Sequence, residues 1–265
     1  QDPADSMLFN MLGRAHDAER NFGEAQRFYQ KAVDLGNAFA YANLAWMMIY
    51  GNGVPQDTRK GMDMLQELAN IGNPYALASL GWIHREGYGG TPRDYGRAFD
   101  YYIKAADQDY ANAETNVAWF YREGMGVERN YERSFEYYRR AAMKGEVNAM
   151  GSLGYALQNG LGVSVNFQEA RYWYEKGVEQ NDAYSESALA WLYREGKGVP
   201  QDYGRALELY RRAAAKNDAT AMASLGYMSQ NGLGTQVDYR EAIQWYEKAA
   251  SQNDAYALSA LGWMY

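Results

Sequence analysis

The chain has 265 residues, of which 47% are hydrophobic and 22% are charged, and its net charge is −7. This balance excludes a disordered chain, and no apolar run approaches the roughly 18 residues that a membrane-spanning helix needs. The absence of cysteine excludes disulfides and thiolate metal sites, and the negative charge argues against non-specific nucleic-acid binding, which requires a basic stripe. Because the chain begins at Gln1 without a charged and apolar leader, we expect it to be a processed or trimmed part of a longer protein.

A glycine recurs along the chain at a nearly fixed spacing of 36 or 37 residues. It stands at Gly51, Gly87, Gly124, Gly160, Gly196 and Gly232. A period in this range is typical of a solenoid. In residues 112–145, apolar residues at helical spacing lie on both sides of Gly124 and Gly126. Each repeat is therefore predicted to be two short antiparallel helices, A and B, joined by a glycine-rich turn.

The opening helix pair differs from the others. Its turn, residues 19–21, lacks the two glycines, and we expect residues 1–36 to form an atypical terminal hairpin or cap. Helix A of the next repeat is predicted at about 39–50 and its helix B at about 58–70. The turn after Gly87 carries one extra residue, at a place where added length costs little.

The remaining chain is predicted to be one continuous solenoid over residues 37–265. The expected repeats are 37–72, 73–109, 110–145, 146–181, 182–217, 218–253 and a partial repeat at 254–265. An Asp or Asn precedes each helix B and is expected to cap it, at Asp57, Asp94, Asn130, Asn166, Asp202 and Asp238. Residues 117–188 and 189–260 are identical at more than half of their positions, which indicates duplication of a two-repeat block.

The repeat unit resembles the Sel1-like repeat, a relative of the tetratricopeptide repeat. The resemblance rests on Leu153-Gly154, on Gly160-Leu161-Gly162-Val163, on Trp173-Tyr174-Glu175-Lys176 and on their counterparts in the other copies. It covers about residues 37–265, whereas residues 6–36 look closer to a plain tetratricopeptide repeat. It implies an all-α, right-handed α-solenoid whose A helices line a concave face, and a non-catalytic role in binding other proteins. Because many bacterial members work in the periplasm or at the cell surface, it also implies a periplasmic, secreted or surface location.

No constellation of residues points to catalysis. The only histidines, His16 and His84, lie in different repeats, and acidic residues recur on helix surfaces as in a solvated face. Glu123 and Glu195 are two repeats apart, too far for shared acid–base work. The Gly-x-Gly turns recur between two helices and not between a strand and a helix, so they do not indicate a phosphate-binding loop. We therefore expect no enzyme, no metal site and no cofactor.

A column of aromatic residues occupies one position of helix A, directly after the small residue of the Leu-Gly or Leu-Ala pair or its equivalent. Its members are Trp46, Trp82, Trp119, Tyr155, Trp191, Tyr227 and Trp263. By analogy with the tetratricopeptide repeat, this position points into the concave groove. About one turn further along helix A stand charged residues, among them Arg85, Arg122, Glu123, Arg194 and Glu195. Two interpretations remain open, because the rings can pack against the neighbouring A helix and can also form a binding surface.

The favoured hypothesis is a protein-interaction scaffold that binds a peptide or protein partner in this aromatic groove, with Arg122 and Arg194 contacting carboxylates. The alternative hypothesis is binding of a polysaccharide or cell-wall glycan that stacks on the rings. A further expectation concerns the last helix A, whose apolar residues have no helix B to cover them: Leu258, Leu261, Trp263, Met264 and Tyr265. Such a patch predicts weak self-association through the C-terminal end.

Overall fold

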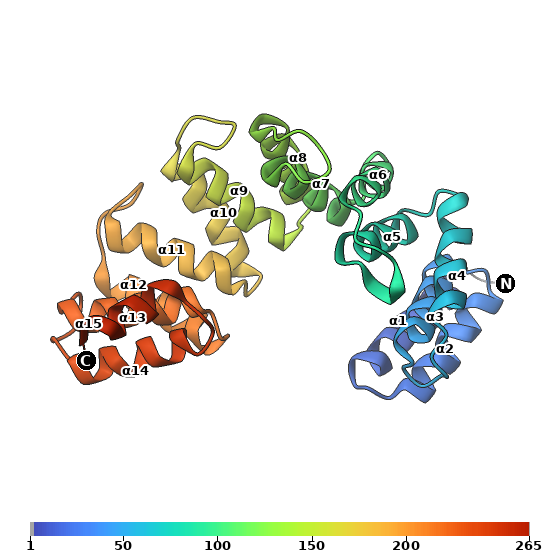
Figure 1. Ribbon diagram of the computed structural model, residues 1–265, viewed down its shortest axis with the longest axis horizontal. Coiled ribbons are helices and arrows are strands. Elements are labelled where there is room, and N and C mark those ends of the chain that lie inside the picture. Colours follow the sequence, from blue (N-terminus) through green and yellow to red (C-terminus); the bar gives the residue numbers. More distant parts are fainter. Residues whose placement is uncertain (1–2, 265) are drawn as a thin grey trace. The chain divides into compact units, whose positions relative to one another are not determined.

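The computed structural model describes residues 3–264, which form fifteen α-helices and one short 3₁₀ helix, with no strand among them (Figure 1). The expected all-α fold of solenoid hairpins is confirmed. The chain divides into two compact units, Gln1–Asn130 and Tyr131–Tyr265. Tyr265, which belongs to the expected apolar patch at the C-terminal end, lies outside the described residues.

In the first unit, odd-numbered helices are A helices and even-numbered helices are B helices. They are α1 (Pro3–Ala18), α2 (Phe22–Asp34), α3 (Ala38–Tyr50), α4 (Thr58–Asn70), α5 (Pro74–Glu86), α6 (Tyr95–Ala106) and α7 (Ala111–Glu123). The expected ranges of α3 and α4 are confirmed to within one residue. The extra residue after Gly87 is accommodated by a short 3₁₀ helix, Tyr88–Gly90. Each B helix contacts the next A helix, so the hairpins stack on one another.

The second unit continues the same alternation. Its helices are α8 (Tyr131–Met143), α9 (Val147–Asn159), α10 (Phe167–Glu179), α11 (Ala183–Glu195), α12 (Tyr203–Ala215), α13 (Ala219–Asn231), α14 (Tyr239–Ala250) and α15 (Ala255–Met264). The expected Asx caps of helix B are confirmed where the structure describes them, since Asp57, Asp94, Asn166, Asp202 and Asp238 each accept a backbone N–H of the first turn. These side chains satisfy donors that a helix start leaves unpaired.

The two glycines of each turn have different roles. Gly196 ends α11 with φ +64°, a left-handed conformation that favours glycine. Gly198 also has a positive φ, and a carbon added to it would lie 2.8 Å from the backbone and Cβ of Phe167. The first glycine therefore stops helix A, whereas the second lets the turn rest on the start of helix B in the preceding hairpin.

Within a hairpin, a small residue of helix A receives a tyrosine ring of helix B. A carbon added to Gly154 would lie 2.5 Å from the ring of Tyr174, and the same addition at Gly226 would lie 2.7 Å from Tyr246. Both tyrosines are fully buried. We call this contact the glycine–tyrosine notch. It explains why the apolar–small pair recurs in helix A and why the second aromatic residue of helix B belongs to the core.

One expectation about acidic residues is wrong. Glu114 and Glu186 are fully buried in A helices and do not lie on a solvated face. In the second unit, Glu186 of α11 forms ion pairs with Arg212 of α12 at 2.6 Å and with Lys216, the residue that caps the end of α12, at 2.8 Å. The Lys216 contact is also a hydrogen bond, whereas the Arg212 contact lacks hydrogen-bond geometry. A buried carboxylate is tolerable only because these charges compensate for its lost hydration.

Candidate functional site

The aromatic column of helix A is distributed over both units. Trp46, Trp82 and Trp119 lie on α3, α5 and α7 of the first unit. Tyr155, Trp191, Tyr227 and Trp263 lie on α9, α11, α13 and α15 of the second. Trp263 is 91% exposed, and the other six rings are only partly covered. These rings are therefore accessible, in contrast to the buried tyrosines of the B helices.

In the first unit, the rings contact one another and still present surface. The ring centroids of Trp46 and Trp82 are 5.5 Å apart in a T-shaped arrangement, and Tyr88 lies 5.4 Å from Trp82. The indole N–H of Trp46 donates a hydrogen bond to Ser79 Oγ on the next A helix, at 3.2 Å. The two interpretations of the column thus hold together here, because the rings pack between neighbouring helices and keep one part in contact with solvent.

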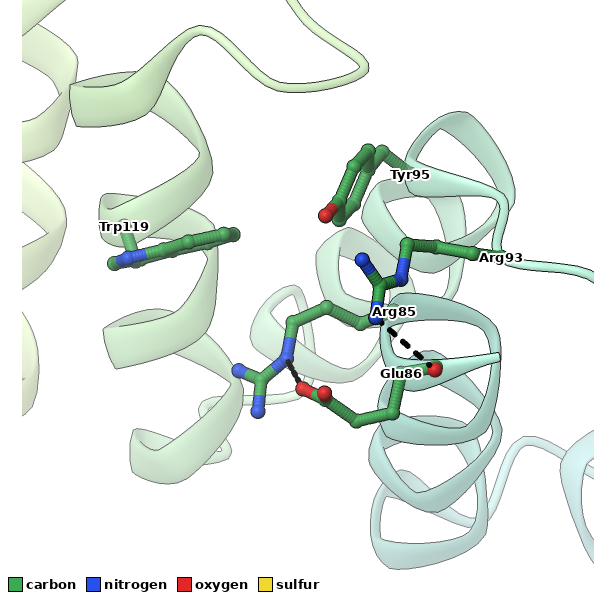
Figure 2. Close-up of a pocket in the computed structure, with 5 residues that line it drawn as sticks. All are labelled: Arg85, Glu86, Arg93, Tyr95 and Trp119. Atoms are coloured by element: carbon green, nitrogen blue, oxygen red, sulfur yellow. Dashed lines mark hydrogen bonds and ion pairs between the residues drawn. The ribbon is translucent and has the colours of Figure 1, made fainter. Parts of the chain in front are cut away.

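Beside Trp119 the first unit has a pocket of about 370 Å³. Figure 2 shows its five lining residues, Arg85, Glu86, Arg93, Tyr95 and Trp119. The Arg85 guanidinium lies over the Trp119 ring, 5.7 Å from its centroid. It also donates to Glu86 Oε1 at 2.7 Å and to Asn116 Oδ1 at 2.7 Å. Arg85 is therefore held in place by three contacts, each of which uses its charge.

The other predicted arginines are also engaged within the chain. The Nε atom of Arg122 donates to Glu123 at 2.7 Å, and that of Arg194 donates to Glu195 at 2.7 Å. The Arg194 guanidinium lies over the ring of Tyr227, 5.2 Å from its centroid. The predicted residues Arg85, Trp119, Arg194 and Tyr227 are thus brought together in pairs, each pair spanning two successive A helices.

The second unit has a cavity of about 240 Å³ against Trp191. Its lining includes the rings of Tyr155, Tyr184 and Trp191 and the polar side chains of Gln158, Ser224 and Asp218. The carboxylate of Asp218 caps α13 by accepting the N–H of Ala221, at 2.6 Å. We call this space the Trp191 cavity.

Burial shapes the protonation of the groups that line this cavity. It raises the pKa of the phenols of Tyr174 and Tyr210, so both remain neutral hydrogen-bonding groups. The Tyr174 hydroxyl donates to Gln158 Oε1 at 3.0 Å. Burial also raises the pKa of Asp218, an effect that its hydrogen bonds to Ala221 and Ser187 oppose. The cavity therefore combines ring faces with one carboxylate and several neutral polar groups.

Sequence reasoning missed several residues of this cavity. Tyr184 and Asp218 line the cavity but are not among the site residues predicted from the sequence. The available signal was the replacement of the Arg-Glu pair of helix A by Gln158-Asn159 in the hairpin before Trp191. Among the described residues there is no cluster of His, Cys, Asp and Glu that fits a metal ion. No helix in that same range is both long and apolar enough to cross a membrane.

Comparison with known proteins identifies the repeat. A family model described as Sel1 repeat matches residues 6–37, 38–73, 74–110, 111–146, 147–182, 183–218 and 219–254. A search of curated proteins finds no significant match.

Solved structures agree with this match. The chain is similar to a Sel1 repeat protein from Oxalobacter formigenes, with 27% identity and a TM-score of 0.79 over 91% of this chain and 98% of that one. It is also similar to c5321, described as a protective antigen present in uropathogenic Escherichia coli strains displaying an SLR fold. That likeness has 28% identity and a TM-score of 0.75, and it covers 98% of this chain but 56% of the other. Immunity protein Pa5087 from Pseudomonas aeruginosa, at 18% identity and a TM-score of 0.51 over 81% of each chain, is similar in fold alone.

Proposed function

This chain belongs to the Sel1 repeat family, and we propose that it binds a peptide or protein partner through the aromatic column of its A helices. Members of the family generally serve as scaffolds for protein–protein interaction and are typically non-catalytic. The observation that carries the proposal is the partial exposure of the helix A rings, beside arginines held in fixed positions by neighbouring glutamates. Partly exposed aromatic side chains next to arginine are the residue types that dominate binding energy at protein interfaces.

The restraint of the arginines supports this function. Arg85 and Arg194 each have their Nε atom bound to a glutamate, and each guanidinium is stacked near a ring. A partner that contacts these groups does not have to order long, mobile side chains, so it loses less conformational entropy on binding. The remaining N–H groups of a fixed guanidinium can donate hydrogen bonds to a partner's carboxylate in a defined direction.

The test removes one ring of the aromatic column from each unit, by Trp119→Ala combined with Trp191→Ala. We expect recovery of the partner in a pull-down to fall by at least tenfold, because truncating a central interface tryptophan commonly costs about 2 kcal/mol or more. The matched control is Tyr172→Ala, which removes an exposed ring from the B helix α10. Circular dichroism must show that all variants keep their helical content. Unchanged partner recovery by the folded double variant contradicts the proposal.

A second candidate function is glycan binding at the Trp191 cavity. It is favoured by the combination of ring faces with amide and hydroxyl groups, since a sugar ring stacks on aromatic surface while its hydroxyls form hydrogen bonds. Titration with cell-wall or exopolysaccharide fragments, followed by tryptophan fluorescence, separates this candidate from the first. Absence of quenching at millimolar saccharide excludes it.

A further inference from the structure

Five A helices, α5, α7, α9, α11 and α13, end in one of two kinds of residue pair. Arg-Glu stands at 85–86, 122–123 and 194–195, whereas Gln-Asn stands at 158–159 and 230–231. The two kinds differ in charge but occupy the same position of the repeat, immediately before the glycine that ends helix A. The difference therefore changes the surface between one A helix and the next, and also the hairpin itself, since Gln158 and Gln230 each accept a hydrogen bond from a tyrosine of their own B helix.

In two of the Arg-Glu pairs, the arginine covers the ring of the following A helix. Arg85 lies over Trp119, with 5.7 Å between the guanidinium carbon and the ring centroid. Arg194 lies over Tyr227 at 5.2 Å. These are cation–π contacts, in which the negative face of the ring attracts the delocalised positive charge. The chain thus supplies its own guanidinium to two rings of the aromatic column.

Where the pair is Gln158-Asn159, no such group reaches the next ring. Gln158 accepts a hydrogen bond from the Tyr174 hydroxyl at 3.0 Å, and Asn159 donates back to the carbonyl of Tyr155 in its own helix at 2.8 Å. Ala188 stands where the corresponding residue of the first unit, Asn116, binds Arg85. Among the described residues, no arginine or lysine lies over Trp191, and the Trp191 cavity occupies this place.

The chemistry of the cavity favours a positively charged occupant. Ring faces of tryptophan and tyrosine attract cations, and the Asp218 carboxylate lies in the same lining. The oxygen of Gln158 and the hydroxyl of Ser224 provide further hydrogen-bond acceptors. No basic side chain is part of the lining, so the cavity contains no positive charge that would repel a cationic occupant.

We propose that the Trp191 cavity receives an arginine side chain from a partner protein, whose guanidinium takes the place that Arg85 takes over Trp119 and Arg194 takes over Tyr227. The inference rests on the proposed function and assigns the partner a chemical feature. An arginine fits better than a lysine because its planar group stacks on the indole while its N–H groups reach the carboxylate. The partner's binding segment is therefore basic, in keeping with the negative charge of this chain.

The test uses the full chain labelled with 5-fluorotryptophan, in which the Trp191 fluorine resonance is assigned from the Trp191→Phe variant. The probes are acetyl-arginine amide and acetyl-citrulline amide, which have nearly the same shape and differ in charge. We expect the Trp191 resonance to shift with the arginine probe at millimolar concentration and to respond to citrulline about tenfold more weakly. Asp218→Asn, which keeps a capping side chain, is expected to weaken the arginine response several-fold.

A variant that introduces an arginine next to the cavity gives a sharper control. Gln158→Arg combined with Asn159→Glu recreates the Arg-Glu pair of the other hairpins, so the new arginine is expected to cover Trp191 and abolish the response. The same double change at the next hairpin, Gln230→Arg with Asn231→Glu, is expected to leave the Trp191 response unchanged. Both variants keep residue types that the repeat already accepts at these positions.

Three results overturn the inference. They are an equal response to citrulline, no response to either probe, or a response that survives Gln158→Arg with Asn159→Glu. If the Trp191 resonance shifts with cell-wall oligosaccharide and not with the arginine probe, the cavity binds glycan and not arginine. The two proposals can fail separately. If the Trp119→Ala, Trp191→Ala variant loses the partner but the parent protein does not respond to the arginine probe, this inference fails and the proposed function stands.

Discussion

At the scale of single residues, the glycine–tyrosine notch sets which side chains helix A tolerates. Gly154 leaves room for the Tyr174 ring, and that ring has no exposed surface. Overfilling such a contact forces the ring or the backbone to move, which typically costs about 1–3 kcal/mol. This cost outweighs the gain of roughly 1 kcal/mol that alanine gives over glycine within a helix.

We therefore predict that Gly154→Ala destabilises the protein and lowers its thermal unfolding midpoint. The chain offers a matched control, because Gly262 of α15 holds the same position of the repeat and has no atom within 4 Å of an added carbon. Gly262→Ala is expected to leave the midpoint unchanged or to raise it slightly. Equal midpoints for the two variants, measured by circular dichroism, contradict the notch.

The sequence places the two residues of the notch in the core, but it indicates neither their contact with each other nor the arginine contacts. A small residue in helix A and a tyrosine in helix B recur at fixed positions, so periodicity alone assigns them to the core. By contrast, Arg85 binds the residue next to it, and adjacent residues on a helix are not expected to face each other. The contact forms because a third group, the Trp119 ring of the following A helix, holds the guanidinium in place.

At the scale of helices, the buried carboxylate of Glu186 joins α11 to α12. Its two ion pairs supply the charge that its burial requires, and the side chains of Arg212 and Lys216 are 40% and 32% exposed. Replacing Glu186 by glutamine leaves two cations that can turn toward water. The variant therefore loses only the stability that the charge-assisted contacts contribute, about 1–3 kcal/mol, because no unpaired charge is left buried.

We predict that Glu186→Gln lowers the free energy of unfolding by this amount in urea denaturation. Glu208→Gln on α12 is the matched control, since it removes an exposed partner of Arg205. Exposed ion pairs of this kind contribute about 0–1 kcal/mol, so the control should stay close to the parent protein. If the two variants lose equal stability, the buried ion pairs do not hold the hairpin together.

Glu186 shows why the sequence predicts the helices better than the contacts between them. Turn glycines and Asx caps are local signals, and they placed α3 and α4 correctly. The partners of Glu186 stand 26 and 30 residues further along the chain, so no local signal indicates its ion pairs. The Trp191 cavity escaped prediction for a similar reason, because it depends on where the hydrogen bond from Tyr174 holds Gln158.

At the scale of the whole molecule, α15 presents an apolar surface. This helix packs on α13 and α14, yet Leu258 is 52% exposed and Trp263 is 91% exposed. Burying a few hundred Å² of such surface gains several kcal/mol at roughly 25 cal/mol per Å², and association consumes much of that gain. The balance favours a weak contact between copies.

We predict concentration-dependent self-association at high micromolar protein, seen in sedimentation velocity. Leu258→Lys with Trp263→Lys is expected to abolish it. The exposed apolar residues of α1 provide a matched control, and Met7→Lys with Met11→Lys should leave it unaffected. If the parent protein sediments as a monomer at every concentration, the contact does not form. If the α1 variant abolishes self-association, the contact lies at α1 and not at α15.

The glycine–tyrosine notch also bears on how the chain is made. Both partners of each notch belong to one hairpin, so the contact closes over a short stretch of chain and does not wait for distant segments. Proteins built from such local contacts fold quickly, and segments generally fold in the order in which synthesis delivers them. Each hairpin can therefore form its glycine–tyrosine contact soon after it leaves the ribosome, and the next hairpin can then stack on it. An interrupted translation product is then a shorter stack with its finished hairpins intact.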